Sequence, residues 1–379
     1  MMVNKVFEHV GSFLRPKELQ EARTAFETGQ IGLGDLVEIE DKAIRDLVDK
    51  QIEAGLEKVT DGEFRRAYWH LDFFWGFNGV EHVHAAEGYR FHDETTKADS
   101  ALLSGKITGD NHPFVAAYQF LKNYVDEKSG VVEAKYTIPA PAQFYFELIR
   151  DAEHVANLND IYPNFEDVRK DIKEAYLTVI NDLVAAGLKT LQVDDCTWGV
   201  LVDGNFLTGW GAATGQTAQE VRDNLANLFL TLNNDVYENV PEGLTLNTHV
   251  CRGNFHSTWA TSGPYDAVAD ELFNREVVDS YFLEYDNERS GGFEPLAKVS
   301  GDKVAVLGLI TSKNGSLEDK ETVVARIREA EHFLPLDRLW LSTQCGFAST
   351  EEGNILTEED QWKKLALVKD IIDEVWGSK

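Results

Sequence analysis

The feature that most constrains the fold of this chain is a regular alternation of strand-like and helix-like segments over its last two thirds. Short runs rich in apolar and β-branched residues are each followed by a longer run with helical spacing of its apolar residues. Strands are predicted at 132–138, 190–194, 244–250, 280–284, 303–310 and 338–343. Helices are predicted among and after them at 167–186, 218–237, 265–274, 320–333 and 358–375.

The N-terminal part supplies two further strand units. The first spans 5–13, and Pro16 after it suits the first turn of a helix that runs toward Phe26. A second helix, 33–54, ends at Gly55 and precedes a short strand at 58–61. Eight strand units, nearly all separated by helices, predict an α/β fold, a (β/α)8 TIM barrel formed as one domain over 1–379. The alternative is a doubly wound open sheet, although the glycines of 209–215 match a dinucleotide-binding fingerprint only loosely.

Residues 63 to about 130 interrupt this rhythm. The stretch 68–77 is dense in aromatic residues and is followed by a polar stretch. We interpret 63–130 as a long insertion after the second strand that covers the site end of the barrel. Its aromatic stretch 68–77 either lines a pocket for a different donor or is a hydrophobic lid, and Arg65, Arg66 and His70 are candidates for binding an anionic group.

Charge and cysteine content exclude several classes of function. The formal net charge is 36 − 65 = −29, which disfavours nucleic acid and anionic membrane surfaces as partners. The chain has neither an apolar run of about twenty residues nor the apolar run of a signal peptide at its start, so a cytoplasmic protein is expected. Its three cysteines are too few for a disulfide framework. The oligomeric state is not predicted.

A candidate metal site begins with His249 and Cys251, at the end of the predicted strand 244–250. Residues two apart on a strand point to the same face, so the imidazole and the thiol project together. The pair alone is equally well explained by a buried cysteine and a hydrogen-bonded histidine. In a barrel, however, reactive groups gather at the C-terminal strand ends, where Glu284 and Cys345 also lie. These four residues are therefore the predicted ligands of a zinc ion. A mixed set of ligands that includes a carboxylate suits a zinc ion that activates an external thiol.

The same residues carry a resemblance to a known family. Together with Val10-Gly-Ser-Phe13, Asp61-Gly-Glu-Phe64, Leu191-Gln-Val-Asp-Asp195 and Leu339-Trp-Leu-Ser-Thr-Gln-Cys-Gly346, they resemble the catalytic C-terminal domain of cobalamin-independent methionine synthase. The short, single-domain relatives of that family are the most similar in length. The motifs span almost the whole chain in the family's order.

The resemblance implies a (β/α)8 barrel, a zinc cofactor and transfer of a methyl group to the thiol of homocysteine. By position, Val10, Gly11 and Ser12 match the segment that binds the backbone groups of the amino acid. Glu63 and Asp194 match the carboxylates that hold its ammonium group, a role that suits fixed, charged acceptors.

Two departures from the family concern the methyl donor. Thr311 stands where the family has a proton-donating histidine, and the folate-stacking tryptophan segment is not evident around 136–141. A folate donor needs protonation of its leaving nitrogen, which threonine cannot readily supply. A small molecule or a methylated corrinoid is therefore an alternative donor. Cys196 has no ligand role in the family and is interpreted as a packing residue.

Three hypotheses follow. The leading one is a zinc-dependent methyltransferase that converts homocysteine to methionine. The second is a zinc-dependent alkyltransferase that acts on another thiol and donor, for example by opening an epoxide. The third is a non-catalytic relative that binds zinc or a thiol.

Overall fold

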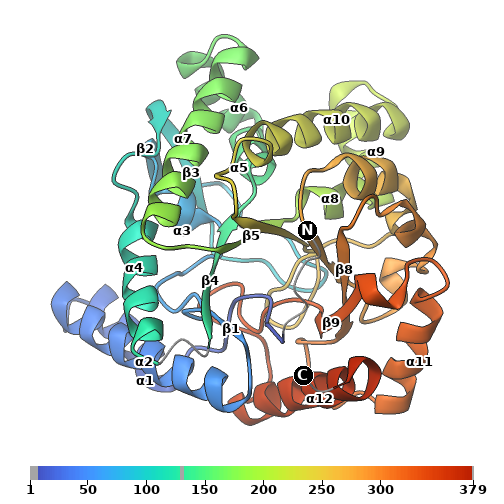
Figure 1. The fold of residues 1–379 in the computed structure, drawn as a ribbon. Helices are drawn as coiled ribbons and strands as arrows, with labels where there is room; N and C mark the ends of the chain where they lie inside the picture. Colours follow the sequence, from blue (N-terminus) through green and yellow to red (C-terminus); the bar gives the residue numbers. More distant parts are fainter. Residues whose placement is uncertain (1–6, 129–131, 378–379) are drawn as a thin grey trace.

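A curled sheet of parallel strands forms the centre of the computed structural model, which describes residues 7–128 and 132–377. Within those residues the sheet has seven strands in the order β1-β4-β5-β6-β7-β8-β9. The strands are β1 (Lys58–Val59), β4 (Glu133–Pro139), β5 (Thr190–Asp195), β6 (Thr245–Val250), β7 (Ser280–Glu284), β8 (Val304–Ile310) and β9 (Leu339–Thr343). Figure 1 shows them surrounded by helices. The architecture is thus α/β and similar to a TIM barrel.

The predicted first strand, 5–13, is not a strand where the structure describes it, and residues 5 and 6 lie outside the described part. Glu8 makes a single parallel bridge to Lys58 of β1. Beyond it, the carbonyl oxygens of Val10 and Gly11 accept hydrogen bonds from side chains, the Gln192 amide (2.7 Å) and the Thr60 hydroxyl (2.7 Å). Because side chains satisfy these carbonyls, no strand ladder forms, and a closed eight-stranded barrel stays a prediction.

The segment 7–13 nevertheless lies between the two edges of the sheet. On the β1 side, Phe13 N–H donates to the Gly62 carbonyl at 3.2 Å. On the β9 side, Phe347 N–H donates to the Ser12 carbonyl at 3.0 Å. The segment therefore bridges the gap that β1 and β9 leave, with side-chain and loop contacts in place of a ladder.

Most connections between strands contain a helix. The α-helices are α1 (Lys17–Glu27), α2 (Leu33–Glu53), α3 (Leu71–Phe74), α4 (Pro113–Asp126), α5 (Pro141–Leu148), α6 (Ala152–Ile161), α7 (Phe165–Ala185), α8 (Thr197–Leu201), α9 (Gly204–Thr214), α10 (Ala218–Tyr237), α11 (Lys320–Ala330) and α12 (Glu358–Trp376). Capping boxes begin α10 at Thr217 and α12 at Thr357, as the sequences Thr-x-x-Glu and Thr-x-x-Asp favour. The predicted helix 265–274 is instead a 3-10 turn, η1 (Tyr265–Val268), followed by a π-helical turn, η2 (Asp270–Arg275). Short 3-10 turns complete the list: η3 (Glu288–Ser290), η4 (Glu294–Lys298) and η5 (Leu336–Arg338).

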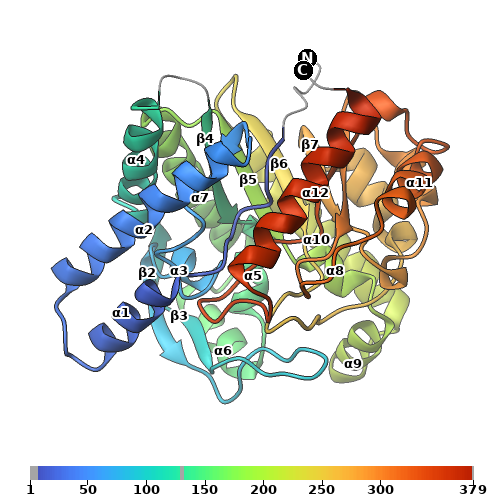
Figure 2. The ribbon, with the colours of Figure 1, turned by 90° about the horizontal axis from the view of Figure 1, so that it is seen from below.

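The predicted insertion, 63–130, has two parts. Its last helix, α4, contacts β4 and α7 and so belongs to the outer layer of helices. The preceding residues form α3 and an antiparallel hairpin of β2 (Asn78–His84) and β3 (Asp99–Thr108). In Figure 2 the hairpin and its connecting loop, 85–98, lie at the same end of the molecule as α6 and α9.

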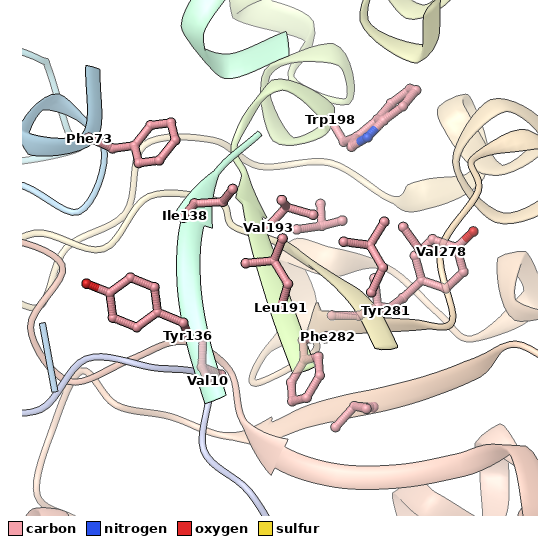
Figure 3. Packing of buried hydrophobic residues seen from close by; sticks show 14 of the residues in the cluster. Val10, Phe73, Tyr136, Ile138, Leu191, Val193, Trp198, Val278, Tyr281 and Phe282 are labelled. Carbon is pink, nitrogen blue, oxygen red and sulfur yellow. The ribbon is translucent and has the colours of Figure 1, made fainter. Parts of the chain in front are cut away.

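The strands are buried on both faces. Figure 3 shows Tyr136 and Ile138 of β4 and Leu191 and Val193 of β5 among the buried apolar side chains. The alternate positions of the same strands are polar, as in the Gln192–Asp194 and Asn247–His249 pairs. The period of two therefore separates an apolar face from a polar face that continues into the site. Among the described residues, no helix combines the length and the apolar character needed to cross a membrane.

Candidate active site

Four donor groups meet at the C-terminal ends of three strands. His249 lies in β6, Cys251 directly after it, Glu284 at the end of β7 and Cys345 two residues after β9. One donor atom from each lies within 4.8 Å of the others, and all four residues are buried. The two sulfur atoms are 3.9 Å apart. The sheet thus brings together the four predicted metal ligands.

Hydrogen bonding leaves the donor atoms of this cluster free to bind a metal. His249 Nδ1 lies 3.2 Å from the Phe282 carbonyl oxygen, so it carries the proton and leaves Nε2 as an acceptor. Nε2 of His249 is buried and has no hydrogen-bond partner, and the same is true of Oε2 of Glu284. Buried polar atoms are nearly always satisfied, so an imidazole acceptor without a partner, beside two thiols and a carboxylate, fits a site for a metal ion.

The geometry fits a zinc ion in particular. Tetrahedral zinc with Zn–S bonds of about 2.3 Å requires sulfurs about 3.8 Å apart, and the observed separation is 3.9 Å. Two thiolates, an imidazole and a carboxylate form a mixed donor set with three kinds of ligand atom. Such a set differs from the closed Cys/His sets of structural zinc sites.

Cations surround the carboxylate of Glu284. Its Oε1 accepts a hydrogen bond from the backbone N–H of Arg252 at 2.7 Å. Arg289 Nη2 and Lys313 Nζ lie 3.6 and 3.9 Å from Oε2. Lys313 is buried, and its Nζ has no hydrogen-bond partner. These three neighbours were not found from the sequence, because their proximity depends on loops after β6, β7 and β8.

A second acidic group lies on the other side of the cluster. Glu63 adopts a left-handed backbone conformation with φ of 61°, a strain of about 1–3 kcal/mol that concentrates at functional sites. Its Oε1 accepts a hydrogen bond from the Thr137 hydroxyl at 2.8 Å, while Oε2 is buried without a partner. Burial and the neighbouring Glu63 carboxylate raise the pKa of Asp194 well above its usual range. Two acids placed so close together favour binding of a cation.

The Val10-Gly11-Ser12 segment passes beside these acids. A Cβ atom on Gly11 would lie 2.9 Å from Thr137 Cγ2 and 3.1 Å from Glu63 Oε1, so glycine allows the close approach. A Cβ atom on Gly346 would lie 2.0 Å from the Ser12 hydroxyl, which places the loop after β9 directly against this segment.

One cavity of about 250 Å³ connects these groups. Its polar side contains Val10, Ser12, Glu63, Asp194, His249, Cys251 and Cys345. Its other side contains the aromatic residues Tyr68, Trp69, Tyr89, Phe91 and Phe146 together with charged residues, Arg90, Glu147 and Arg150. Gly11 and Glu284 do not line the cavity: Gly11 lies behind the Glu63 carboxylate, and Glu284 is fully buried behind the cysteines.

Loop 85–98 closes the aromatic side. His92 N–H donates to the Trp259 carbonyl at 2.7 Å, and the Phe91 and Phe255 rings are 5.3 Å apart. The loop is thereby joined to the segment that follows Cys251. Tyr68, Trp69 and His70 of the aromatic stretch 68–77 also line the cavity, as one of its two predicted alternatives requires.

The three candidate anion-binding residues of the insertion differ in position. Arg65 pairs with Glu40 and Asp41 and does not line the cavity. Arg66 is buried, donates to the Thr137 carbonyl at 2.8 Å and lies 3.6 Å from Glu63. These interactions make Arg66 a support for Glu63.

His70 lines the cavity, and burial followed by the charge of Arg150 lowers its pKa to about 3. It is therefore neutral at physiological pH. Neither arginine contributes to the cavity wall, and His70 lacks the charge that an anion requires.

Two further predictions concern single residues. Cys196 was interpreted as a packing residue, but it lines the cavity within hydrogen-bonding reach of Cys251. Thr311 lies outside the cavity lining; its N–H donates to Glu318 at 2.9 Å, and its hydroxyl accepts from the Lys313 N–H at 3.3 Å. Its interactions are those of a loop-stabilising residue.

Comparisons with known proteins agree with this arrangement. Residues 7–361 match the family model for the cobalamin-independent synthase catalytic domain. The chain is 44% identical to the uncharacterized protein YxjH of Bacillus subtilis, over 97% of this chain and 94% of YxjH. It is 24% identical to a methionine synthase of Saccharolobus solfataricus, over 89% and 86% of the two chains.

A solved structure from Listeria monocytogenes, assigned provisionally as a vitamin-B12 independent methionine synthase, superposes with a TM-score of 0.74. It is 32% identical to this chain, and the match covers 100% of both chains. The chain therefore belongs to the family of cobalamin-independent synthase catalytic domains.

Proposed function

We propose that this protein is a zinc-dependent methyltransferase that transfers a methyl group to the thiol of homocysteine and forms methionine. The observation that carries the proposal is one cavity lined by three members of a sulfur-rich metal cluster, His249, Cys251 and Cys345, and by a buried acid with an orphaned oxygen, Glu63. A thiol at one end and an ammonium at the other match these two features, and homocysteine has both groups.

The metal site would consist of His249, Cys251, Glu284 and Cys345. A zinc ion held there would supply a thiolate at neutral pH, which is the nucleophile that methyl transfer requires. Arg289 and Lys313 lie beside Glu284. Their positive charges would stabilise its carboxylate if the substrate sulfur displaced it from the metal.

The amino-acid end of the substrate would be held by Glu63 and Asp194. Glu63 Oε2 accepts a hydrogen bond from the ammonium group, and the positive charge favours the ionised form of Asp194. The Val10-Gly11-Ser12 segment lies close enough to bind the remaining backbone groups of the amino acid. The charge pattern favours an amino-acid thiol over a thiol that lacks an amine.

The donor would be a methyl compound whose leaving group departs without protonation, such as a sulfonium or a methylated corrinoid. Three observations support this class. Thr311 lies outside the cavity lining, His70 has a pKa of about 3 and is no acid at neutral pH, and the donor side contains aromatic residues. The aromatic residues provide apolar surface for such a donor, and the Arg150 guanidinium, 4.5 Å from the centre of the Tyr89 ring, already fills one cation-binding face.

X-ray absorption at the zinc K-edge, recorded with and without homocysteine, tests the proposal. We expect the number of sulfur ligands to rise from two to three with loss of one oxygen or nitrogen ligand. An unchanged shell with homocysteine would contradict the proposal and favour another thiol or a non-catalytic role.

A further inference from the structure

A second group of metal-binding side chains lies on the β2–β3 hairpin, away from the sulfur cluster. It consists of His82 and His84 of β2 and Asp99 of β3, whose donor atoms lie within 4.8 Å of one another. The group contains no sulfur and is exposed on one side, so it differs in chemistry from the cluster at the strand ends.

The hairpin register explains why the three side chains converge. His82 and His84 are two apart on β2 and so share one face of the hairpin. Asp99 is the direct partner of His84 across the ladder, and Ala101 is the partner of His82. A carboxylate therefore lies opposite one imidazole and diagonal to the other, within reach of both.

Both imidazoles approach the same carboxylate oxygen. His82 Nε2 lies 2.6 Å and His84 Nδ1 lies 3.3 Å from Asp99 Oδ1. A metal ion among these atoms would replace the His82–Asp99 hydrogen bond and the His84–Asp99 ion pair, and it would accept all three groups as ligands. Two imidazoles and one carboxylate on one side of an ion is an established donor set for divalent transition metals.

Two of the ligands are held in place by neighbours. Asp99 is buried, and its Oδ2 accepts a hydrogen bond from the Tyr68 hydroxyl at 2.8 Å. The Trp75 ring stacks on His82 with centroids 4.0 Å apart, and its Nε1 donates to the Ser100 carbonyl at 3.1 Å. Partners of this kind orient ligands and raise metal affinity.

Solvent has access to the remaining side of the site. The side chains of His82 and His84 are 47% and 78% exposed. Water can therefore complete the coordination shell of a bound ion. This exposure also means that either histidine can be replaced at little cost in stability.

We propose that His82, His84 and Asp99 form a second metal site that binds a divalent transition metal such as Zn²⁺ or Co²⁺. The site does not depend on the proposed methyltransferase activity. It is connected to the cavity, because Tyr68, which holds Asp99, also lines the cavity wall. An occupied site would tie β2 to β3 at the base of loop 85–98.

Titration of the metal-free protein with Co²⁺ tests the proposal, since thiolate ligands produce an intense charge-transfer band that imidazole and carboxylate ligands do not. We expect wild-type protein to bind two equivalents of Co²⁺. The equivalent at the sulfur cluster should produce this band, and the equivalent at the hairpin should not. In His82→Ala and His84→Ala the affinity of the equivalent without the band should fall at least ~10-fold, with the thiolate band unchanged.

Two matched variants separate the sites. Cys345→Ser should lose the thiolate band and keep the other equivalent. His92→Ala, which removes an exposed histidine of the same insertion, should keep both. Binding of a single equivalent by wild-type protein, or a second equivalent that persists in the His82→Ala/His84→Ala double variant, would overturn the proposal.

Thermal unfolding supplies an independent readout. Added Zn²⁺, in the presence of a filled sulfur site, should raise the unfolding temperature of wild-type and His92→Ala protein in proportion to log concentration above the dissociation constant. The rise should be absent in His84→Ala. An equal rise in all three proteins would contradict a site at the hairpin.

Discussion

The two sides of the cavity are built in different ways. The polar side includes Asp194 of β5, His249 of β6 and the cysteines just after β6 and β9, together with segment 10–12 and Glu63 beside the sheet. The aromatic side rests on residues 68–70 before α3, on α5 and on loop 85–98, which belong to connections and not to the sheet. His249, whose Nε2 is orphaned, and Glu63, whose Oε2 is orphaned, lie on the polar side.

This difference suggests that the two sides of the cavity have different functions. Strand ends hold ligands in the fixed geometry that metal and ammonium binding require. Connections vary more readily in length and sequence, so they suit the choice of donor. Substitutions on the polar side should therefore abolish thiol alkylation, whereas substitutions on the aromatic side should alter the preference for the methyl donor.

The largest effect is expected for the sulfur cluster. Cys345→Ser should lose zinc and lower the rate of thiol alkylation by more than ~100-fold. This exceeds the loss of roughly 10- to 100-fold that is usual when only a hydrogen-bond partner of a metal ligand is removed. Zinc content by mass spectrometry and single-turnover alkylation measure the two effects. Cys196→Ser is the matched control: the same substitution in the same cavity, outside the ligand set, should leave zinc content unchanged. Full activity of Cys345→Ser would refute the division between the two sides.

A smaller effect is expected at the ammonium end. Glu63→Gln removes a charge-assisted hydrogen bond of about 1.5–3 kcal/mol, so KM for homocysteine should rise roughly 10- to 150-fold. The matched substrate is 4-mercaptobutyrate, which has the thiol and the carboxylate but no amine. Its KM should not rise in the variant. An equal loss for both thiols would favour the hypothesis of another thiol substrate.

A buried acid outside the cavity provides a pH control. Burial and then Asp195 raise the pKa of Glu276 to about 8. Between the unfolded pKa of about 4.3 and about 8, the folded protein therefore holds a proton that the unfolded chain releases. The contribution of Glu276 to stability should fall as pH rises through this window, by up to about 1.4 kcal/mol per pH unit.

Glu276→Gln should flatten this dependence, because a neutral amide can still accept from the Trp198 indole and the Asn233 amide. Urea unfolding of both proteins between about pH 5 and 8 measures the difference in slope. Parallel curves would show that Glu276 titrates normally. Since Glu276 does not line the cavity, the pH dependence of methyl transfer should not follow this change.

The smallest effect is expected at Thr311. Its hydroxyl accepts only from the Lys313 N–H at 3.3 Å and lies outside the cavity lining, so Thr311→Val should change kcat by less than about threefold. A steady-state assay with each candidate donor measures it. A loss of more than tenfold with one donor alone would move the donor site toward the loop after β8.

Local sequence patterns were sufficient for the elements of the sheet and for part of the site. Six of the predicted strands agree with β4 to β9 to within one or two residues, because a short run rich in apolar and β-branched residues is a property of each strand alone. The shared face of His249 and Cys251 follows from the period of two along a strand. The predicted helix 265–274 and strand 5–13 failed where side-chain hydrogen bonds or a π turn replaced regular backbone pairing.

Only the tertiary structure decided which distant groups meet. Cys251 and Cys345 are 94 residues apart in sequence, yet their sulfurs lie 3.9 Å apart. The cations beside Glu284, the exposure of Cys196 to the cavity and the convergence of His82, His84 and Asp99 had no signal in the sequence. Such contacts depend on the register between strands and on the curl of the sheet. Both are set by the packing of the whole chain, and no local period encodes them.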